Sequence, residues 1–211
     1  MIVAIDGPAA AGKGTLARRI AEALGYAHLD TGALYRAVGL GVLRAGQDPA
    51  DERAALGAAL ALDPAGLSDP ALREEETGKA ASIVSAHPPV RAALLEFQRN
   101  FARNPPNRAA GSVVEGRDIG TVVCPDADVK LFIDADLAVR ARRRFTELVA
   151  QDPSLTLASI SAEMASRDER DRNRADSPLK PAPDAHLLDT TDLDIDGAFE
   201  AAMKVIGSVQ K

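Results

Sequence analysis

The residues near the start of the chain have the types and spacing needed to hold phosphate groups. Gly7 and Gly12 frame a loop that ends in Lys13, between an apolar segment (1–6) and a segment with helical apolar spacing (16–24). In this strand–loop–helix context, backbone N–H groups and the positive helix end converge on phosphate oxygens, and the lysine adds a full charge. The sequence therefore predicts a P-loop for a nucleoside triphosphate. Its predicted ATP-binding residues are Gly7, Pro8, Ala9, Ala10, Ala11, Gly12, Lys13, Gly14 and Thr15.

The loop departs from the usual pattern at one position. A Ser or Thr that coordinates Mg²⁺ normally follows the P-loop lysine. In this chain Gly14 follows Lys13, and the hydroxyl comes one place later, at Thr15. We expect Mg²⁺ to accompany ATP, but the sequence does not indicate which residues hold the metal.

Arginines recur at three separated places after the loop, at Arg36, at Arg117 and in the run 167–174. Phosphoryl transfer depends on positioning and on neutralising charge, and the guanidinium group suits both tasks. The pattern therefore favours an acceptor that itself carries phosphate, such as a nucleoside monophosphate. The run 167–174 lies next to the Pro-rich stretch 178–183 and resembles a flap that excludes water, although mixed charge is also typical of a solvated helix. For Arg36, a surface position and an anion-binding position are equally compatible with the pattern.

The elements that must position these residues alternate between strand and helix. Strands are predicted at 1–6, 27–32, 112–115, 128–134 and 185–189, and helices at 16–24, 33–45, 135–150, 155–175 and 195–209. Thr31 is the predicted cap of the second helix. This order predicts an α/β P-loop kinase fold, with a parallel sheet of about five strands flanked by helices. Ligands bind at the carboxyl edge of such sheets, so we expect Arg117 and Asp118 there.

The stretch 46–105 interrupts this alternation and contains several glycines and prolines. Helices are expected at 51–62, at 71–85 with an interruption at Gly78, and at 90–103. The stretch is therefore predicted to be a helical excursion on the substrate side of the sheet. We expect a single P-loop kinase domain with a core (1–45, 106–154 and 185–211), a nucleoside monophosphate-binding excursion (about 46–105) and an Arg-rich lid (about 155–184).

The composition limits the partners and the compartment. The 211 residues carry a net charge of −6, which argues against non-specific nucleic-acid binding. The single cysteine, Cys124, excludes an intrachain disulfide, and no apolar run approaches the roughly 18–20 residues of a membrane span. We therefore expect a cytoplasmic protein, a monomer by default, that binds neither nucleic acid nor membrane.

Three further residues have the chemistry needed to recognise a cytosine base. Cytosine presents an amino donor and two acceptors, which match a carboxylate or hydroxyl and a cation. Ser82, Arg91 and Asp118 supply these groups, although exposed polar positions are an alternative for Ser82 and Arg91. Other open alternatives are a P-loop kinase for another nucleoside monophosphate such as UMP, or for a small metabolite such as shikimate. A regulatory protein that uses ATP as a switch is a further alternative from a different class.

With these motifs in place, the chain resembles the bacterial cytidylate (CMP/dCMP) kinase family over nearly its whole length. Gly-Arg-Asp-Ile-Gly-Thr (116–121) and Arg-Asp-Arg-Asn-Arg (170–174) are the specific segments, whereas the P-loop alone is generic. The full set of matching segments, which includes these two, is 5–15, 29–36, 80–82 with 89–91, 115–123 and 167–174.

The resemblance implies the reaction of ATP with CMP or dCMP to give ADP and CDP or dCDP, with Mg²⁺. It implies that Ser82, Arg91 and Asp118 read cytosine, that Arg167 and Asp171 hold the sugar, and that Arg36, Arg117 and Arg174 gather the phosphates. Arg140 is the candidate for stacking on adenine. The catalytic candidates are Lys13, Arg117, Asp118 and Arg174.

The chain departs from the family pattern in two places. Glu115 stands where an Asp is common, which keeps the charge but lengthens the reach. The segment between Leu62 and Ala80 is short and lacks a longer insert of small antiparallel strands. This second departure bears on substrate closure and on selectivity between CMP and UMP.

Overall fold

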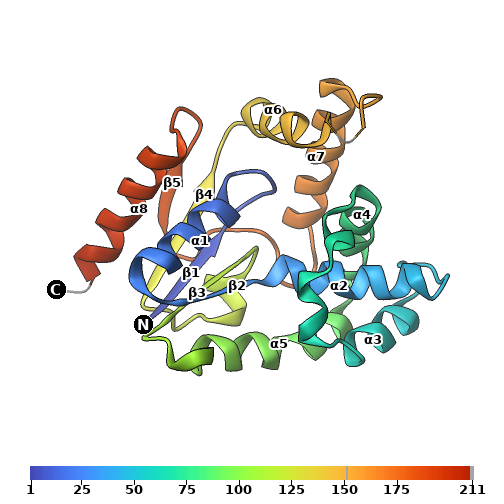
Figure 1. The fold of residues 1–211 in the computed structure, drawn as a ribbon, viewed down its shortest axis with the longest axis horizontal. Helices are drawn as coiled ribbons and strands as arrows, with labels where there is room; N and C mark the ends of the chain where they lie inside the picture. The colour runs from blue at the N-terminus through green and yellow to red at the C-terminus, as the bar shows by residue number, and fades with distance from the viewer. Residues whose placement is uncertain (151, 210–211) are drawn as a thin grey trace. The chain divides into compact units, whose positions relative to one another are not determined.

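The computed structural model describes residues 1–150 and 152–209, and Figure 1 shows the arrangement of its helices and strands. The chain divides into two compact units. The first unit comprises residues 1–28 and the chain from 102 onward, and the second comprises residues 29–101. The expected core segments 106–154 and 185–211 include residues 151, 210 and 211, which lie outside the described residues. The expected division into core, excursion and lid stays a prediction.

A five-stranded parallel sheet forms the centre of the first unit, with the strand order β2-β3-β1-β4-β5. Strand β1 pairs in parallel with β3 on one side and with β4 on the other. Val3, Ala4 and Ile5 in β1 are fully buried, as expected for a parallel strand covered on both faces. The predicted P-loop kinase fold is therefore confirmed. The strands are β1 (Ile2–Asp6), β2 (Ala27–Asp30), β3 (Ser112–Gly116), β4 (Val129–Asp134) and β5 (His186–Asp189).

Helices cover this sheet through a core of aliphatic side chains. Leu16 and Ile20 of α1 pack with Ile206 of α8 against buried residues of β1 and β4. Helix α8 has the predicted bounds, whereas α1 begins at Lys13, three residues before the predicted start. Helix α7 is shorter than predicted at both ends, and Thr156 and Ser159 form a capping box at its start. The helices are α1 (Lys13–Leu24), α6 (Leu137–Leu148), α7 (Leu157–Arg172) and α8 (Ile195–Val209).

The second unit is helical and has a hydrophobic core of its own. Leu34 and Val38 of α2 pack with Val84 of α4 in this core. A Cβ on Gly39 would lie 2.9 Å from the backbone nitrogen of Ala81, so the close approach of α2 and α4 requires glycine. The helices are α2 (Thr31–Arg44), α3 (Glu52–Leu60), α4 (Glu75–Val84) and α5 (Pro88–Arg103), the last of which ends in the first unit.

Two local predictions for this unit were wrong. The N-cap of α2 is Asp30 and not Thr31, since the Asp30 carboxylate accepts the backbone N–H of Ala33 at 3.1 Å. Helix α4 runs through Gly78 without interruption, because one glycine in a helix costs only about 1 kcal/mol. The break comes earlier, at Glu74, where the backbone is extended (φ −65°, ψ 149°). Two 3-10 turns, Pro64–Ser68 and Pro70–Arg73, precede it.

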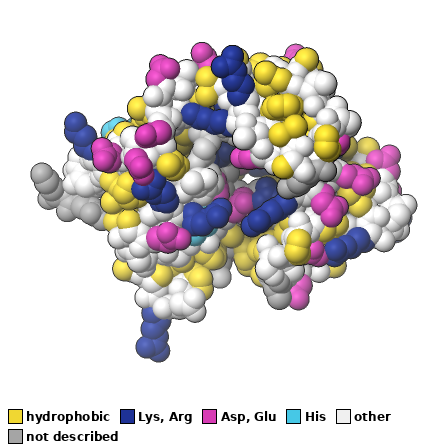
Figure 2. All heavy atoms as spheres, turned by 45° about the horizontal axis from the view of Figure 1, so that its top comes forward, with side chains coloured by type: hydrophobic (Ala, Val, Ile, Leu, Met, Phe, Trp, Pro, Cys, Tyr) yellow, Lys and Arg dark blue, Asp and Glu magenta, His cyan; other side chains and the backbone are white. Residues whose placement is uncertain are grey.

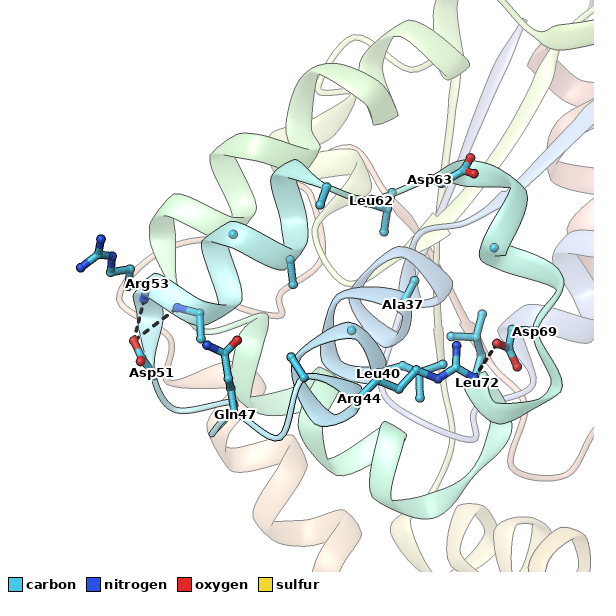
Figure 3. Close-up of a pocket in the computed structure, with 17 residues that line it drawn as sticks. Ala37, Leu40, Arg44, Gln47, Asp51, Arg53, Leu62, Asp63, Asp69 and Leu72 are labelled. Carbon is cyan, nitrogen blue, oxygen red and sulfur yellow. Dashed lines mark hydrogen bonds and ion pairs between the residues drawn. The ribbon is translucent and has the colours of Figure 1, made fainter.

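A pocket of about 820 Å³ lies in the second unit, lined by α2, α3 and the two 3-10 turns (Figure 3). Leu40, Leu62 and Leu72 contribute apolar lining, and Arg44 forms an ion pair with Asp69 at 2.8 Å. None of the residues predicted to bind nucleotide lines this pocket.

Charged side chains of both signs are interspersed on the face of the molecule that Figure 2 draws. Within the described residues, no helix combines the length and apolar character that a membrane crossing requires. Cys124 is buried and is in no disulfide bond.

Candidate active site

The P-loop joins β1 to α1 and has a backbone that its sequence explains. Gly7 has a φ of 147°, and a Cβ there would lie 1.9 Å from the carbonyl oxygen of Ile133, so only glycine fits. Gly12, with a φ of 88°, is the N-cap of α1 and makes Lys13 the first helical residue. The Lys13 ammonium donates to the carbonyl oxygen of Pro8 at 2.9 Å. The lysine therefore reaches back across the loop that precedes its own helix.

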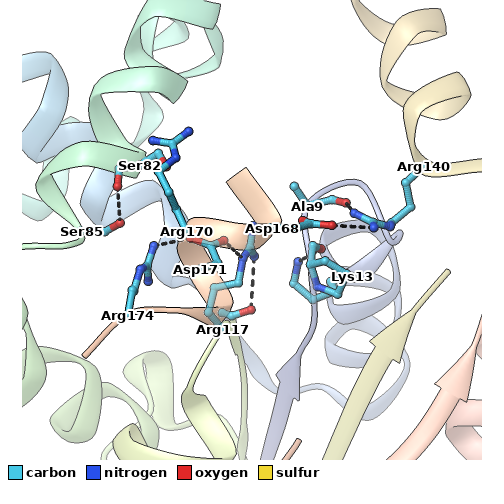
Figure 4. Close-up of polar contacts among 12 residues, drawn as sticks. Ala9, Lys13, Ser82, Ser85, Arg117, Arg140, Asp168, Arg170, Asp171 and Arg174 are labelled. Atoms are coloured by element: carbon cyan, nitrogen blue, oxygen red, sulfur yellow. Dashed lines mark hydrogen bonds and ion pairs between the residues drawn. The ribbon is translucent and has the colours of Figure 1, made fainter. Parts of the chain in front are cut away.

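The tip of the P-loop packs on α6 and α7. Ala10, which has a positive φ of 56°, packs against the hydrophobic cluster formed by these two helices. Arg140 is 3% exposed, and its guanidinium donates to the carbonyl oxygen of Ala9 at 3.2 Å and of Ala135 at 2.8 Å. It also forms a 2.6 Å ion pair with the buried carboxylate of Asp168 (Figure 4). The predicted adenine-stacking residue thus lies beside the P-loop, with its guanidinium held by three acceptors.

The predicted acceptor-side residues of the first unit meet at Asp171 (Figure 4). Arg117 donates to one carboxylate oxygen of Asp171 at 3.0 Å, and Arg174 forms an ion pair with the other. Burial by itself raises the pKa of Asp171, but the charges of Arg117, Arg174 and Arg167 outweigh it and hold that pKa below its usual value. The buried carboxylate of Asp171 therefore lies among three partly buried arginines, and the cluster carries more positive than negative charge.

The loop after β3 carries Arg117 and Asp118 and ends in a π-helical turn, Ile119–Val123. Asp118 is 5% exposed. The backbone N–H groups of Ile119 and Gly120 both donate to the carboxylate of Asp6, each at 2.7 Å. No function was predicted for Asp6 from the sequence motifs. The available signal was an ionisable residue at the end of an otherwise apolar strand, next to the P-loop.

Glu115, the residue that departs from the family pattern, lies close to the P-loop. Its carboxylate is 3.2 Å from Nε2 of His28. A Cβ on Gly14 would lie 3.3 Å from the same carboxylate, which leaves little room for a larger residue after Lys13. A side chain at this position would require the Glu115 carboxylate to shift slightly.

The remaining predicted residues belong to the second unit, and two of them, Ser82 and Arg91, are buried. Ser82 is 6% exposed and Arg91 is 7% exposed, so the alternative of solvent exposure is wrong for both. The Ser82 hydroxyl has no hydrogen-bond partner among the described residues. The Arg91 guanidinium donates to the carbonyl oxygen of Ser85 at 3.3 Å and lies 5.7 Å from the ring of Tyr35.

Arg36 lies in the second turn of α2, close to the positive end of the helix, where a cation is unfavourable. Its guanidinium forms a 2.6 Å ion pair with Asp30, the residue that caps the same helix. Asp30 thus accepts a hydrogen bond from a backbone N–H at the start of the helix and also pairs with the positive charge of Arg36. The Arg36 side chain is 30% exposed.

The fold is shared with solved structures of low sequence identity. An uncharacterised protein from Eubacterium ventriosum matches with a TM-score of 0.57 and 15% identity, over 99% of both chains. A sugar kinase from Janibacter sp. HTCC2649 matches with a TM-score of 0.50 and 13% identity, over 99% of this chain and 96% of that chain. At these identities the likeness shows the architecture alone.

Sequence comparison is more specific. A family model described as cytidylate kinase matches residues 3–208. A cytidylate kinase of Bradyrhizobium diazoefficiens is 55% identical over 100% of this chain and 97% of its own length. One from Paramagnetospirillum magneticum is 56% identical over 98% of both chains. The motifs predicted this relationship, and this chain belongs to the cytidylate kinase family.

Proposed function

We propose that this chain is a kinase that transfers the γ-phosphoryl group of ATP, supplied as its Mg²⁺ complex, to CMP or dCMP. The products are ADP and CDP or dCDP. Family membership over the whole chain supports this reaction. The structural observation that carries it is the arginine cluster around Asp171. Arg117 follows β3 and the P-loop follows β1, and these neighbouring parallel strands end at the same sheet edge.

On the donor side, the P-loop holds the phosphates of ATP. Lys13 is the cation of this loop, and the left-handed Gly12 directs the N-terminus of α1 toward the phosphates. Arg140 is assigned to the adenine side because it contacts the loop at Ala9. The nine P-loop residues from Gly7 to Thr15 are assigned to ATP.

On the acceptor side, the arginines hold phosphate and sugar. Arg36, Arg117 and Arg174 are assigned to the phosphates of CMP and of the transferring group, and Arg167 and Asp171 to the sugar. Phosphate oxygens compete well for arginine, because bidentate, charge-assisted hydrogen bonds are about twice as strong as neutral ones. Incoming CMP would therefore take over part of the neutralising role that Asp171 plays in this structure.

Ser82, Arg91 and Asp118 are assigned to the cytosine base. All three side chains are buried, and the Ser82 hydroxyl has no hydrogen-bond partner among the described residues. A buried hydroxyl of this kind is satisfied when a ligand supplies the missing partner. The proposed catalytic residues are Lys13, Arg117, Asp118 and Arg174. The composition and the single buried cysteine support a cytoplasmic monomer as part of this proposal.

The test is ADP formation from MgATP with CMP, dCMP, UMP, AMP or shikimate supplied one at a time. Fast turnover with CMP and dCMP and slow turnover with UMP would support the proposal. Equal rates with CMP and UMP would retain the kinase and refute the assignment of Asp118 to the cytosine amine. Tight ATP binding without turnover of any acceptor would refute the kinase and favour a regulatory protein.

A further inference from the structure

Resting on that proposed function, we propose that Asp6 is a positioning residue whose carboxylate holds the loop after β3, so that Arg117 and Asp118 are set for the acceptor nucleotide. The role differs from that of the P-loop residues next to it. Asp6 acts on the acceptor side, through the backbone of a segment more than a hundred residues away in the sequence.

The contact is short, doubled and buried. One Asp6 oxygen accepts the N–H of Ile119 and the other accepts the N–H of Gly120, each at 2.7 Å. Asp6 is 4% exposed, and it is the last residue of β1, paired in register with Gly116 of β3. Asp6 thus contacts the start and the end of the loop, by strand pairing at Gly116 and through its carboxylate at Ile119 and Gly120. Two hydrogen bonds from a charged acceptor restrain both position and rotation of this loop.

These two hydrogen bonds replace a helix cap that the loop does not form for itself. The open N–H groups at the start of a helical turn are usually satisfied by the side chain of the N-cap residue. The N-cap of the turn Ile119–Val123 is Asp118, and its side chain makes no cap hydrogen bond. Asp6 supplies the acceptors from the neighbouring strand. The turn is therefore capped without the side chain of Asp118.

The space around the contact admits little change. A Cβ on Gly120 would lie 3.4 Å from the Asp6 carboxylate and 3.2 Å from Cδ of Lys130. Lys130 cannot move away easily, because its ammonium is held by Asp184 at 2.8 Å and by the carbonyl oxygen of Pro125 at 2.6 Å. A side chain at position 120 would therefore crowd this contact. Asn at position 6 offers an acceptor to only one of the two N–H groups.

The proposed role of Asp6 should depend on pH, because it requires the carboxylate to be ionised. Burial is the main cause that raises the pKa of Asp6 to about 6, and the nearby charge of Asp118 raises it further. The hydrogen bonds from Gly120 and Ile119 and the charge of Lys13 lower this pKa but do not cancel the effect of burial. Protonation turns one acceptor oxygen into a donor, and one of the two N–H groups then loses its partner. The positioning effect should therefore weaken as the pH falls below about 6.

The experiment measures steady-state kinetics of the full chain with Asp6→Asn, with Asp128→Asn as the matched control. Asp128 also accepts a backbone N–H of β1, that of Ile2 at 2.6 Å, but at the opposite end of the strand. For Asp6→Asn we expect a rise in KM for CMP of roughly tenfold, the typical effect of losing a hydrogen bond to a charged group. KM for ATP should stay within about twofold of the wild-type value, and the preference for CMP over UMP should narrow.

The pH profile supplies the second criterion. The phosphate of CMP itself titrates near pH 6, so the informative quantity is the wild-type to Asp6→Asn ratio of kcat/KM for CMP. This ratio should shrink below about pH 6. Kinetic constants equal to those of Asp128→Asn, or a loss shared equally by ATP and CMP, would overturn the inference. If Asp6→Asn does not fold, Gly120→Ala tests the same contact by the KM criterion. Failure of the proposed function would appear separately, as absent CMP turnover in the wild type.

Discussion

Replacing Asp6 by Asn should also change the way in which the free energy of unfolding depends on pH. Burial raises the pKa of the Asp6 carboxyl from 3.8 to about 6, so the folded state favours its neutral form. The resulting contribution to stability is fully present below pH 3.8 and is lost as the pH rises through about 6. A difference of about two pKa units corresponds to about 3 kcal/mol. Asn at position 6 does not titrate, so the free energy of unfolding of the variant lacks this pH-dependent contribution.

The assay is urea unfolding of the wild type and Asp6→Asn, followed by far-ultraviolet circular dichroism between pH 4 and pH 7.5. Other titrating groups contribute almost equally to both proteins and cancel in the difference. The free energy of unfolding of the variant, relative to wild type, should therefore increase by roughly 2–3 kcal/mol across this range. Asp128→Asn provides the background for losing a carboxylate that accepts a backbone N–H at the other end of β1. A difference that stays flat within about 1 kcal/mol would refute the account of Asp6.

Three further substitutions test other parts of the site. Asp118→Ala should lower CMP turnover roughly a hundredfold or more and leave ATP binding nearly unchanged, and intact CMP turnover would contradict its assignment to the base. Asp168→Asn should destabilise the protein by about 3 kcal/mol, because it leaves the charge of Arg140 buried and unpaired. Thermal unfolding measures this effect, with a variant in which apolar residues replace both Arg140 and Asp168 as the comparison. Gly7→Ala should abolish ATP binding, since its Cβ would lie 1.9 Å from a backbone oxygen. Its control, Gly78→Ala, has open space within α4 and should stabilise the fold by about 0.5–1 kcal/mol in the same unfolding assay.

Local sequence was sufficient for the elements whose geometry depends on nearby residues. The P-loop could be predicted because Gly7 and Gly12 occupy backbone conformations that glycine tolerates, next to a lysine at a helix start. The parallel sheet followed from short apolar runs separated by helices, and α8 followed from its apolar spacing. The cap of α2 shows the limit of such patterns. Asp30 and Thr31 are both good capping residues, and the path of the chain leaving β2 decides between them.

Tertiary structure alone decided which distant groups meet. The partners of Asp6 lie 113 and 114 residues away, and they are adjacent to it only because β3 and β1 are neighbours in the sheet. Arg140 belongs to an arginine run typical of a solvated face, yet it is buried against Asp168, 28 residues later. Burial and long-range pairing depend on the strand order and on how the helices cross. Because those arrangements are global properties of the fold, the residue types at single positions do not reveal them.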